Sequence, residues 1–295
     1  MPAIVCRVLE LVLAQLRPCQ DLDCVEFFSG GEAGEAVTKG MAFFNLRAFG
    51  LEIKKDAVFH YFCSAEGFTL AICMVERLAP GGMSFLAPVC SNWIWLVRSV
   101  SGRCSAFPLG YEWVPDVAWS NAMVARVVLL LTMLAAKKCA WMIEQPLSSV
   151  LYLHPRFQWF LSMHCTYRFT LDMYQYGGDT AKPTVVYCSH PWFEDILRDA
   201  FDRPKAEKTL ASREWCPVKE KFVVTGNADI KSSQHYPIAF GRCVARVYHR
   251  HREELRAAAL EHLTSLSTMP APIQDLDDWA DANMGEVIEY AQSLD

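Results

Sequence analysis

Short apolar runs alternate with segments of helical periodicity along this chain, and this alternation limits the fold more than any other feature of the sequence. The apolar runs have the length of β-strands and end at glycine, proline or polar residues. They lie at 24–29, 47–53, 83–87, 140–143, 167–175 and 183–189. Helices are predicted at 1–16, 35–44, 69–78, 121–138 and 238–263. This order predicts an α/β fold with a mainly parallel sheet and helices on both faces. A short connection through Gly177-Gly178 predicts an antiparallel edge hairpin.

The domain organisation is predicted from length and charge. A chain of 295 residues holds one large α/β domain or two small ones. We expect an N-terminal helix within 1–20, a single domain at 21–265 and an acidic tail at 266–295. From 270 onward the chain has seven acidic residues and no Lys or Arg, which is typical of a solvated tail. The polar segment 200–235 shows few periodic signals.

Composition excludes several classes of protein. Hydrophobic residues make up 52% of the chain and charged residues 21%, which indicates a globular protein rather than a disordered one. The net charge of -5 means that a nucleic acid would have to bind a local basic patch. The twelve cysteines lack the spacing of a zinc site, so no metal is expected. No secretory signal is recognised, which predicts thiols and an intracellular location in nucleus or cytoplasm. The apolar run 124–136 is too short to span a membrane, so no membrane association is expected.

Two strand ends suggest a cofactor site. The turn Phe28-Ser29-Gly30-Gly31-Glu32-Ala33-Gly34 follows the first strand, and it is either a ligand loop or a plain tight turn. Glu52 ends the next strand, 18 residues after Gly34. An acid at about this spacing accepts the hydroxyls of a ribose, although it could also be a surface residue. Together the two features favour a cofactor that contains a nucleoside.

Two further strand ends carry reactive side chains. Cys90 lies in a loop just after a strand, where a thiolate could act as a nucleophile, but most cysteines are structural. Glu144 directly follows an apolar strand, and partial desolvation of its carboxyl group would suit proton donation. A helix-capping or surface role is the alternative for Glu144.

These strand ends, in this order, resemble the DNA cytosine-5 methyltransferases over about residues 25–248. The first family motif is similar to Glu26-Phe27-Phe28-Ser29-Gly30, and the Pro-Pro-Cys motif is similar to Pro88-Val89-Cys90. Glu144 matches the Glu of the Glu-Asn motif. The hairpin with Lys182-Pro183-Thr184 is similar to that of compact phage-type relatives, and 234–237 resembles the segment that closes the fold. The resemblance implies a Rossmann-like class I methyltransferase fold with S-adenosylmethionine as cofactor.

The resemblance also implies roles for individual residues. Catalysis would rest on Cys90 and Glu144, and Lys182 would contact the substrate, with Trp93 and Arg98 as further candidates. Cofactor contacts would come from Phe28, Ser29, Gly30, Gly31, Gly34 and Glu52. The target cytosine would be flipped out of nucleic acid, with DNA favoured over RNA, and Cys90 would add to C6 of the ring while Glu144 steadies N3.

Departures from the family pattern keep three functions open. Glu32 and Ala33 replace loop glycines, Val89 replaces a proline, Gln145 replaces an asparagine, and 189–234 is too short for a full target-recognition domain. The chain could be an active cytosine methyltransferase, an inactive binding or scaffold module of the same fold, or a methyltransferase for another substrate.

Several basic and aromatic residues also have two interpretations. The arginines at 242, 246, 250, 252 and 256 could bind phosphates or form a solvated, ion-paired helix face. Trp93 and Trp95 could stack on a base or belong to the core. Arg103 is, with Arg98, a secondary candidate for substrate contact.

Overall fold

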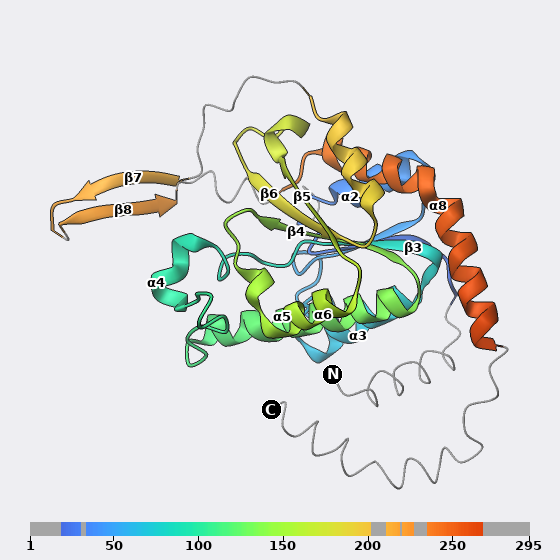
Figure 1. Ribbon diagram of the computed structural model, residues 1–295, viewed down its shortest axis with the longest axis horizontal. Helices are drawn as coiled ribbons and strands as arrows, with labels where there is room; N and C mark the ends of the chain where they lie inside the picture. The colour runs from blue at the N-terminus through green and yellow to red at the C-terminus, as the bar shows by residue number, and fades with distance from the viewer. Residues whose placement is uncertain (1–18, 31–33, 202–210, 219, 227–234, 268–295) are drawn as a thin grey trace, which may run out of the picture.

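A six-stranded sheet forms the centre of the computed structural model, which describes residues 19–30, 34–201, 211–218, 220–226 and 235–267 (Figure 1). The strand order is β2-β1-β3-β4-β6-β5. Strands β1, β2, β3 and β4 are parallel, and β6 is antiparallel to both β4 and β5. The strands are β1 (Leu22–Phe27), β2 (Ala48–Leu51), β3 (Leu78–Leu86), β4 (Ala140–Pro146), β5 (Tyr167–Asp172) and β6 (Pro183–Cys188). The predicted mainly parallel, Rossmann-like sheet with an antiparallel edge hairpin is confirmed.

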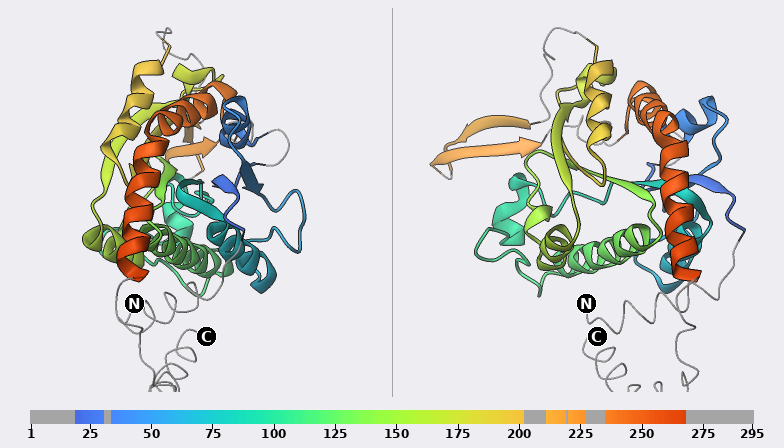
Figure 2. Two further views of the ribbon diagram at one scale, coloured as in Figure 1. Left: turned by 90° about the vertical axis from the view of Figure 1, so that its right-hand side faces the viewer. Right: turned by 45° about the vertical axis from the view of Figure 1, so that its right-hand side comes forward.

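Helices cover both faces of this sheet (Figures 1 and 2). One face carries α3 (Ala65–Glu76), α5 (Pro115–Ala136) and α6 (Pro155–Met163). The other carries α2 (Ala36–Phe43), η4 (Pro191–Asp199) and α8 (Ile238–Ser267). Consecutive strand residues point to opposite faces, so each buried strand contributes to both apolar cores. In β3, for example, Phe85 belongs to the core under α8 and Leu86 to the core over α5.

Helix α5 is the main support of one face. It begins six residues earlier than the predicted 121, because Pro115 occupies the first turn, where its missing N–H group costs nothing. By length and composition α5 could cross a membrane, but 61% of its most apolar window is buried inside the protein. The helix predicted at 121–138 is therefore present, and most of its apolar part is packed into the core.

Some elements were not predicted. Strands β7 (Ala211–Cys216) and β8 (Lys221–Gly226) form a separate antiparallel pair within 200–235, which projects away from the main sheet in Figure 1. The short helices η1 (Trp95–Val97), α4 (Arg98–Ser101), η2 (Leu151–Leu153) and η3 (Met173–Tyr176) and the longer α6 and η4 also had no predicted counterpart. The predicted strand 167–175 ends at Asp172, whose side chain accepts a hydrogen bond from Tyr174 N at 3.0 Å. The predicted N-terminal helix and the acidic tail lie outside the described residues.

Candidate active site

A cavity of about 260 Å³ lies at the carboxyl ends of the parallel strands. Strand β2 lies on one side of β1 and strand β3 lies on the other, so the strand order reverses at β1. Ligands of open α/β sheets bind at such a reversal. The cavity is lined by Phe28, Gly30, Leu51, Glu52, Ile53, Lys54, His60, Tyr61, Phe62, Ala87, Pro88, Val89, Cys90, Ser91, Trp119, Glu144, Lys182, His235 and Tyr236.

One end of the cavity is formed by the turn after β1. Phe28 and Gly30 both have positive φ, at 62° and 81°, which is the left-handed conformation that favours glycine. The turn closes through a 2.7 Å bond from Glu35 N to Ser29 O. A Cβ atom at Gly34 would lie only 2.0 Å from Ser29 O. Glycine at position 34 is therefore required by this turn. Gly31, Glu32 and Ala33 lie outside the described residues.

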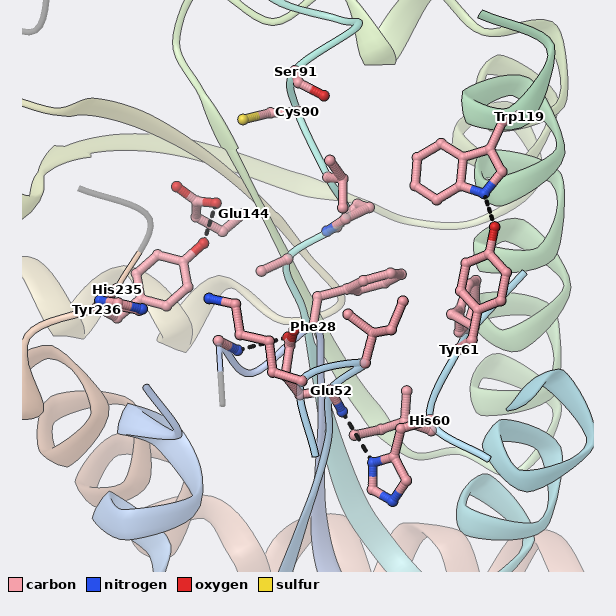
Figure 3. A pocket seen from close by; sticks show the side chains of 18 of the residues that line it. Phe28, Glu52, His60, Tyr61, Cys90, Ser91, Trp119, Glu144, His235 and Tyr236 are labelled. Carbon is pink, nitrogen blue, oxygen red and sulfur yellow. Dashed lines mark hydrogen bonds between the residues drawn. The ribbon is translucent and has the colours of Figure 1, made fainter. Parts of the chain in front are cut away.

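Glu52 joins this turn from the end of β2. Its Oε2 accepts a hydrogen bond from Gly30 N at 2.9 Å, and its own backbone N donates to His60 Nδ1 at 3.2 Å. Burial lowers the pKa of His60, with a further lowering from the nearby charge of Lys55. The two features that predicted a nucleoside cofactor are thus brought into contact. Phe28, Gly30 and Glu52 line the cavity (Figure 3), whereas Ser29 and Gly34 are not among its lining residues.

Aromatic side chains form the wall of this end. Trp119 Nε1 on α5 donates a hydrogen bond to Tyr61 Oη at 2.7 Å, which ties the loop after β2 to the helix (Figure 3). The rings of Phe28 and Phe62 lie 4.8 Å apart between their centroids. Such a wall suits a flat, partly apolar ligand. His60, Tyr61 and Trp119 had no predicted role; Pro115 at the helix start was the signal that could have placed Trp119 on α5.

The other end of the cavity holds Cys90, in the loop after β3. Gln145 Nε2 donates to Pro88 O at 2.6 Å and so fastens this loop to β4. The backbone N–H groups of Trp93 and Ile94 donate to Cys90 O, at 2.8 and 3.2 Å. Gln145 is 1% exposed, so its amide serves the loop rather than a ligand.

Glu144 lies on β4 at the same end, where three side chains surround its carboxylate. Lys182 Nζ is 3.3 Å from Oε1, and Thr184 Oγ1 is 3.4 Å from the same oxygen. Tyr236 Oη donates to Oε2. Figure 3 shows the sulfur of Cys90 on the side of the cavity where Glu144 lies. The structure therefore brings Cys90, Glu144 and Lys182 together, and adds Tyr236, which the sequence had placed only in the segment that closes the fold.

The surroundings of Cys90 affect its ionisation. Burial raises the pKa of the thiol to about 11; the negative charge of Glu144 raises it further, and the positive charge of Lys182 lowers it. Cys90 is therefore almost entirely a thiol at neutral pH, and it reacts as a nucleophile only through its small thiolate fraction or after its surroundings change.

Two candidate substrate contacts are corrected by the structure. Trp93 is fully buried, with the Cζ atom of Arg103 3.5 Å from its ring centroid. Arg103 is 1% exposed and donates to the carbonyls of Asn92, Pro108, Leu109 and Val117 and to Ser120 Oγ. Neither residue lines the main cavity, because both hold the segment after Cys90 together. The core alternative therefore applies to Trp93.

Arg98 is exposed and lies outside the main cavity. It lines a smaller recess of about 190 Å³, together with Trp95 and Tyr152. Arg98 is thus separated from Glu144 and Lys182, and the structure does not bring it to the predicted substrate site.

The arginines of α8 are largely ion-paired. Arg246 pairs with Asp199, Arg250 lies 3.2 Å from Asp195, and Arg252 lies 2.7 Å from Asp23. These partners come from η4 and β1, and Arg252 also lies 3.7 Å from Glu253 of its own helix. Pairing offsets the positive charge of the helix, so the ion-paired interpretation describes α8 better than a free phosphate-binding patch.

No metal site is found within the part of the chain that the structure describes. No group of three or more His, Cys, Asp or Glu side chains there could hold a metal ion. The described cysteines are free thiols.

Comparisons with known proteins add little. No protein-family model matches the sequence, and no curated protein matches it. Among solved structures, the chain resembles the crystal structure of the S. pombe Dnmt2 methyltransferase with a TM-score of 0.37 and 10% sequence identity. The match covers 85% of this chain and 99% of that one. At this level of similarity we draw nothing about function from the match.

Proposed function

We propose that this protein is an S-adenosylmethionine-dependent methyltransferase that transfers a methyl group to C5 of cytosine in nucleic acid. One observation carries the proposal: a single cavity holds a glycine turn with Glu52 at one end and Cys90, Glu144 and Lys182 at the other. The family resemblance supports DNA before RNA as the partner, in the nucleus or cytoplasm. Fold alone does not fix a function, so the proposal rests on this arrangement of side chains.

The first end of the cavity fits the cofactor. Ser29 Oγ is buried without a hydrogen-bond partner among the described residues, and it follows a strand end where Phe28 lines the cavity. Glu52 presents a carboxylate to the same space and would accept the ribose hydroxyls. Ile53, Tyr61 and Phe28 would hold the flat base. When bound, S-adenosylmethionine supplies an electrophilic methyl group.

The second end fits the pyrimidine. The thiolate of Cys90 would form a bond to C6 of the cytosine, and the displaced electron pair would collect on N3 and C5. Lys182 would stabilise this negative charge, and Glu144 would accept a hydrogen bond from the exocyclic amine. C5 would then take the methyl group as the bond between that group and the cofactor sulfur breaks, and the electron pair of the broken bond would remain on the sulfur. Transfer of the C5 proton to solvent and release of the Cys90 thiolate would restore the aromatic ring.

A binding module without catalysis is the second candidate. The observation that favours it is the raised pKa of Cys90, about 11, which leaves little thiolate at neutral pH. Val89, at the position of a family proline, is 40% exposed and does little to hold the loop. In this account the cavity would still bind the cofactor.

Methyl transfer from tritiated S-adenosylmethionine separates the two candidates. Single-stranded and duplex DNA and RNA would be offered to the natural protein, to Cys90→Ala and to Cys104→Ala, a matched change at a half-buried cysteine outside the main cavity. The proposal expects label in cytosine with the natural protein and Cys104→Ala, and none with Cys90→Ala. Label that survives Cys90→Ala would contradict the mechanism. Calorimetric binding of the cofactor without any transfer would favour the binding module.

A further inference from the structure

Tyr236 contacts both charged partners of the candidate active site. Its hydroxyl donates to Glu144 Oε2, and Lys182 Nζ lies 4.6 Å from the centroid of its ring (Figure 3). Lys182 in turn lies 3.3 Å from the other carboxylate oxygen of Glu144. One aromatic side chain therefore binds the anion through its hydroxyl and the cation through its ring face.

The position of Tyr236 is fixed by the core. It is 8% exposed. Its ring packs edge-on against Phe85 of β3, with 5.5 Å between centroids, and in a tilted arrangement against Phe240 of α8, with 5.7 Å between centroids. It lies two residues before the start of α8, whereas Glu144 lies 92 residues earlier on β4. A hydroxyl held this firmly keeps one carboxylate oxygen in a single orientation.

We propose that Tyr236 is a positioning residue that holds Glu144 and Lys182 as a pair beside Cys90. Its effect on catalysis rests on the proposed function, but its effect on the thiol does not. The hydroxyl partly offsets the charge of Glu144, and Glu144 is close enough to disfavour the Cys90 thiolate. Burial, together with Glu144, raises the pKa of Tyr236 well above its usual value, so the phenol remains a donor.

The consequence for Cys90 has a definite sign. Without the Tyr236 hydroxyl the charge of Glu144 is less offset, and the Cys90 thiolate becomes less favourable. Tyr236→Phe should therefore slow alkylation of Cys90 by iodoacetamide at pH 8 by about threefold, as expected for a shift of half a pKa unit. Glu144→Gln should speed it. In the Glu144→Gln background, Tyr236→Phe should cause no further change, because the charge that it acts on is gone.

The alkylation rate would be followed by mass spectrometry of the peptide that contains Cys90. Tyr176→Phe is the matched control, since Tyr176 is buried, donates to Ile196 O at 3.0 Å and packs on the same Phe240, but lies outside the cavity. It should leave the rate at Cys90 unchanged. Thermal unfolding of each variant would show that it is folded before its rate is compared.

The proposal is overturned if Tyr236→Phe leaves the rate unchanged, or if it slows alkylation equally with and without Glu144. If the non-additive pattern holds and the natural protein also transfers methyl groups, Tyr236→Phe should lower kcat at an unchanged KM for the cofactor. If the pattern holds without any methyl transfer, the proposed function fails while the positioning role of Tyr236 stands.

Discussion

Glu26 gives the fold a pH dependence that can be measured. Its side chain is fully buried on β1 and accepts hydrogen bonds from Thr38 N and Thr38 Oγ1, both at 2.7 Å, and from Val37 N at 3.4 Å. These donors lie at the start of α2. Burial raises the pKa of Glu26 from 4.5 to about 7, although the bonds from Thr38 and Val37 lower it in part.

The sign of the effect follows from this raised value. Between pH 4.5 and about 7 the folded protein holds a proton on Glu26 that the unfolded chain has released. The contribution of Glu26 to stability is therefore full below pH 4.5 and is lost as the pH rises through about 7. Since one pKa unit corresponds to about 1.4 kcal/mol, the loss is about 3 kcal/mol.

Glu26→Gln removes this titration. The side-chain amide of the glutamine would place an N–H group opposite the N–H group of Val37, and two donors cannot bond to each other. This should lower the free energy of unfolding by about 1–3 kcal/mol at every pH. The free energy of unfolding of the natural protein minus that of the variant should therefore fall by about 3 kcal/mol between pH 4.5 and 8. Urea unfolding at several pH values measures this difference. The cost of the amide is the same at every pH, so it does not affect the change of the difference with pH.

An exposed carboxylate in the first turn of a helix provides the control. Glu66→Gln on α3 should give a profile parallel to that of the natural protein. If the profile of Glu26→Gln were also parallel, within about 1 kcal/mol, Glu26 would titrate normally and the argument from burial would be refuted.

Three further predictions concern the cavity and its supports. Arg103→Met should destabilise the protein by about 3–5 kcal/mol in urea unfolding, because several buried carbonyls lose their donor. Gly34→Ala should weaken binding of S-adenosylmethionine at least about tenfold in calorimetry, since its Cβ would meet Ser29 O at 2.0 Å. Trp119→Phe should weaken the same binding about fivefold, because it removes the 2.7 Å bond to Tyr61 Oη and frees the loop.

Each of these changes has a matched control. Arg98→Met replaces an exposed arginine and should shift stability by no more than about 0.5 kcal/mol. Gly177→Ala alters a glycine of positive φ with nothing within 4 Å of the added Cβ, and should leave cofactor binding unchanged. Trp159→Phe changes a half-buried tryptophan that does not line the cavity, and it should also leave cofactor binding unchanged. Equal effects in a variant and its control would refute the corresponding prediction.

The strands of the sheet could be predicted because each of them is marked by a short, continuous stretch of the sequence. Apolar runs that end at glycine or proline, such as the one before Gly30, mark the strands directly, and their carboxyl ends meet at one edge of a parallel sheet. This is why Glu52, Cys90 and Glu144 could be proposed for one site from the sequence alone. The hairpin of β7 and β8 lacks a strong alternation of apolar and polar residues, and it was missed.

The remaining site residues depend on contacts between distant parts of the chain. Tyr236 meets Glu144 across 92 positions, and no spacing rule links the two. Arg103 was, with Arg98, a secondary candidate for substrate contact. Its guanidinium instead satisfies several carbonyls and stacks on Trp93, which only the folded chain reveals.

The most direct test of the proposed chemistry is a covalent trap at Cys90. An oligonucleotide that carries 5-fluorocytosine would be incubated with the protein and S-adenosylmethionine, and the peptides would be analysed by mass spectrometry. Fluorine at C5 cannot leave as a proton does, so the bond between Cys90 and C6 should persist. We predict an adduct on the peptide that contains Cys90, with the methyl group added. Cofactor binding without any adduct at Cys90 would contradict the proposed mechanism.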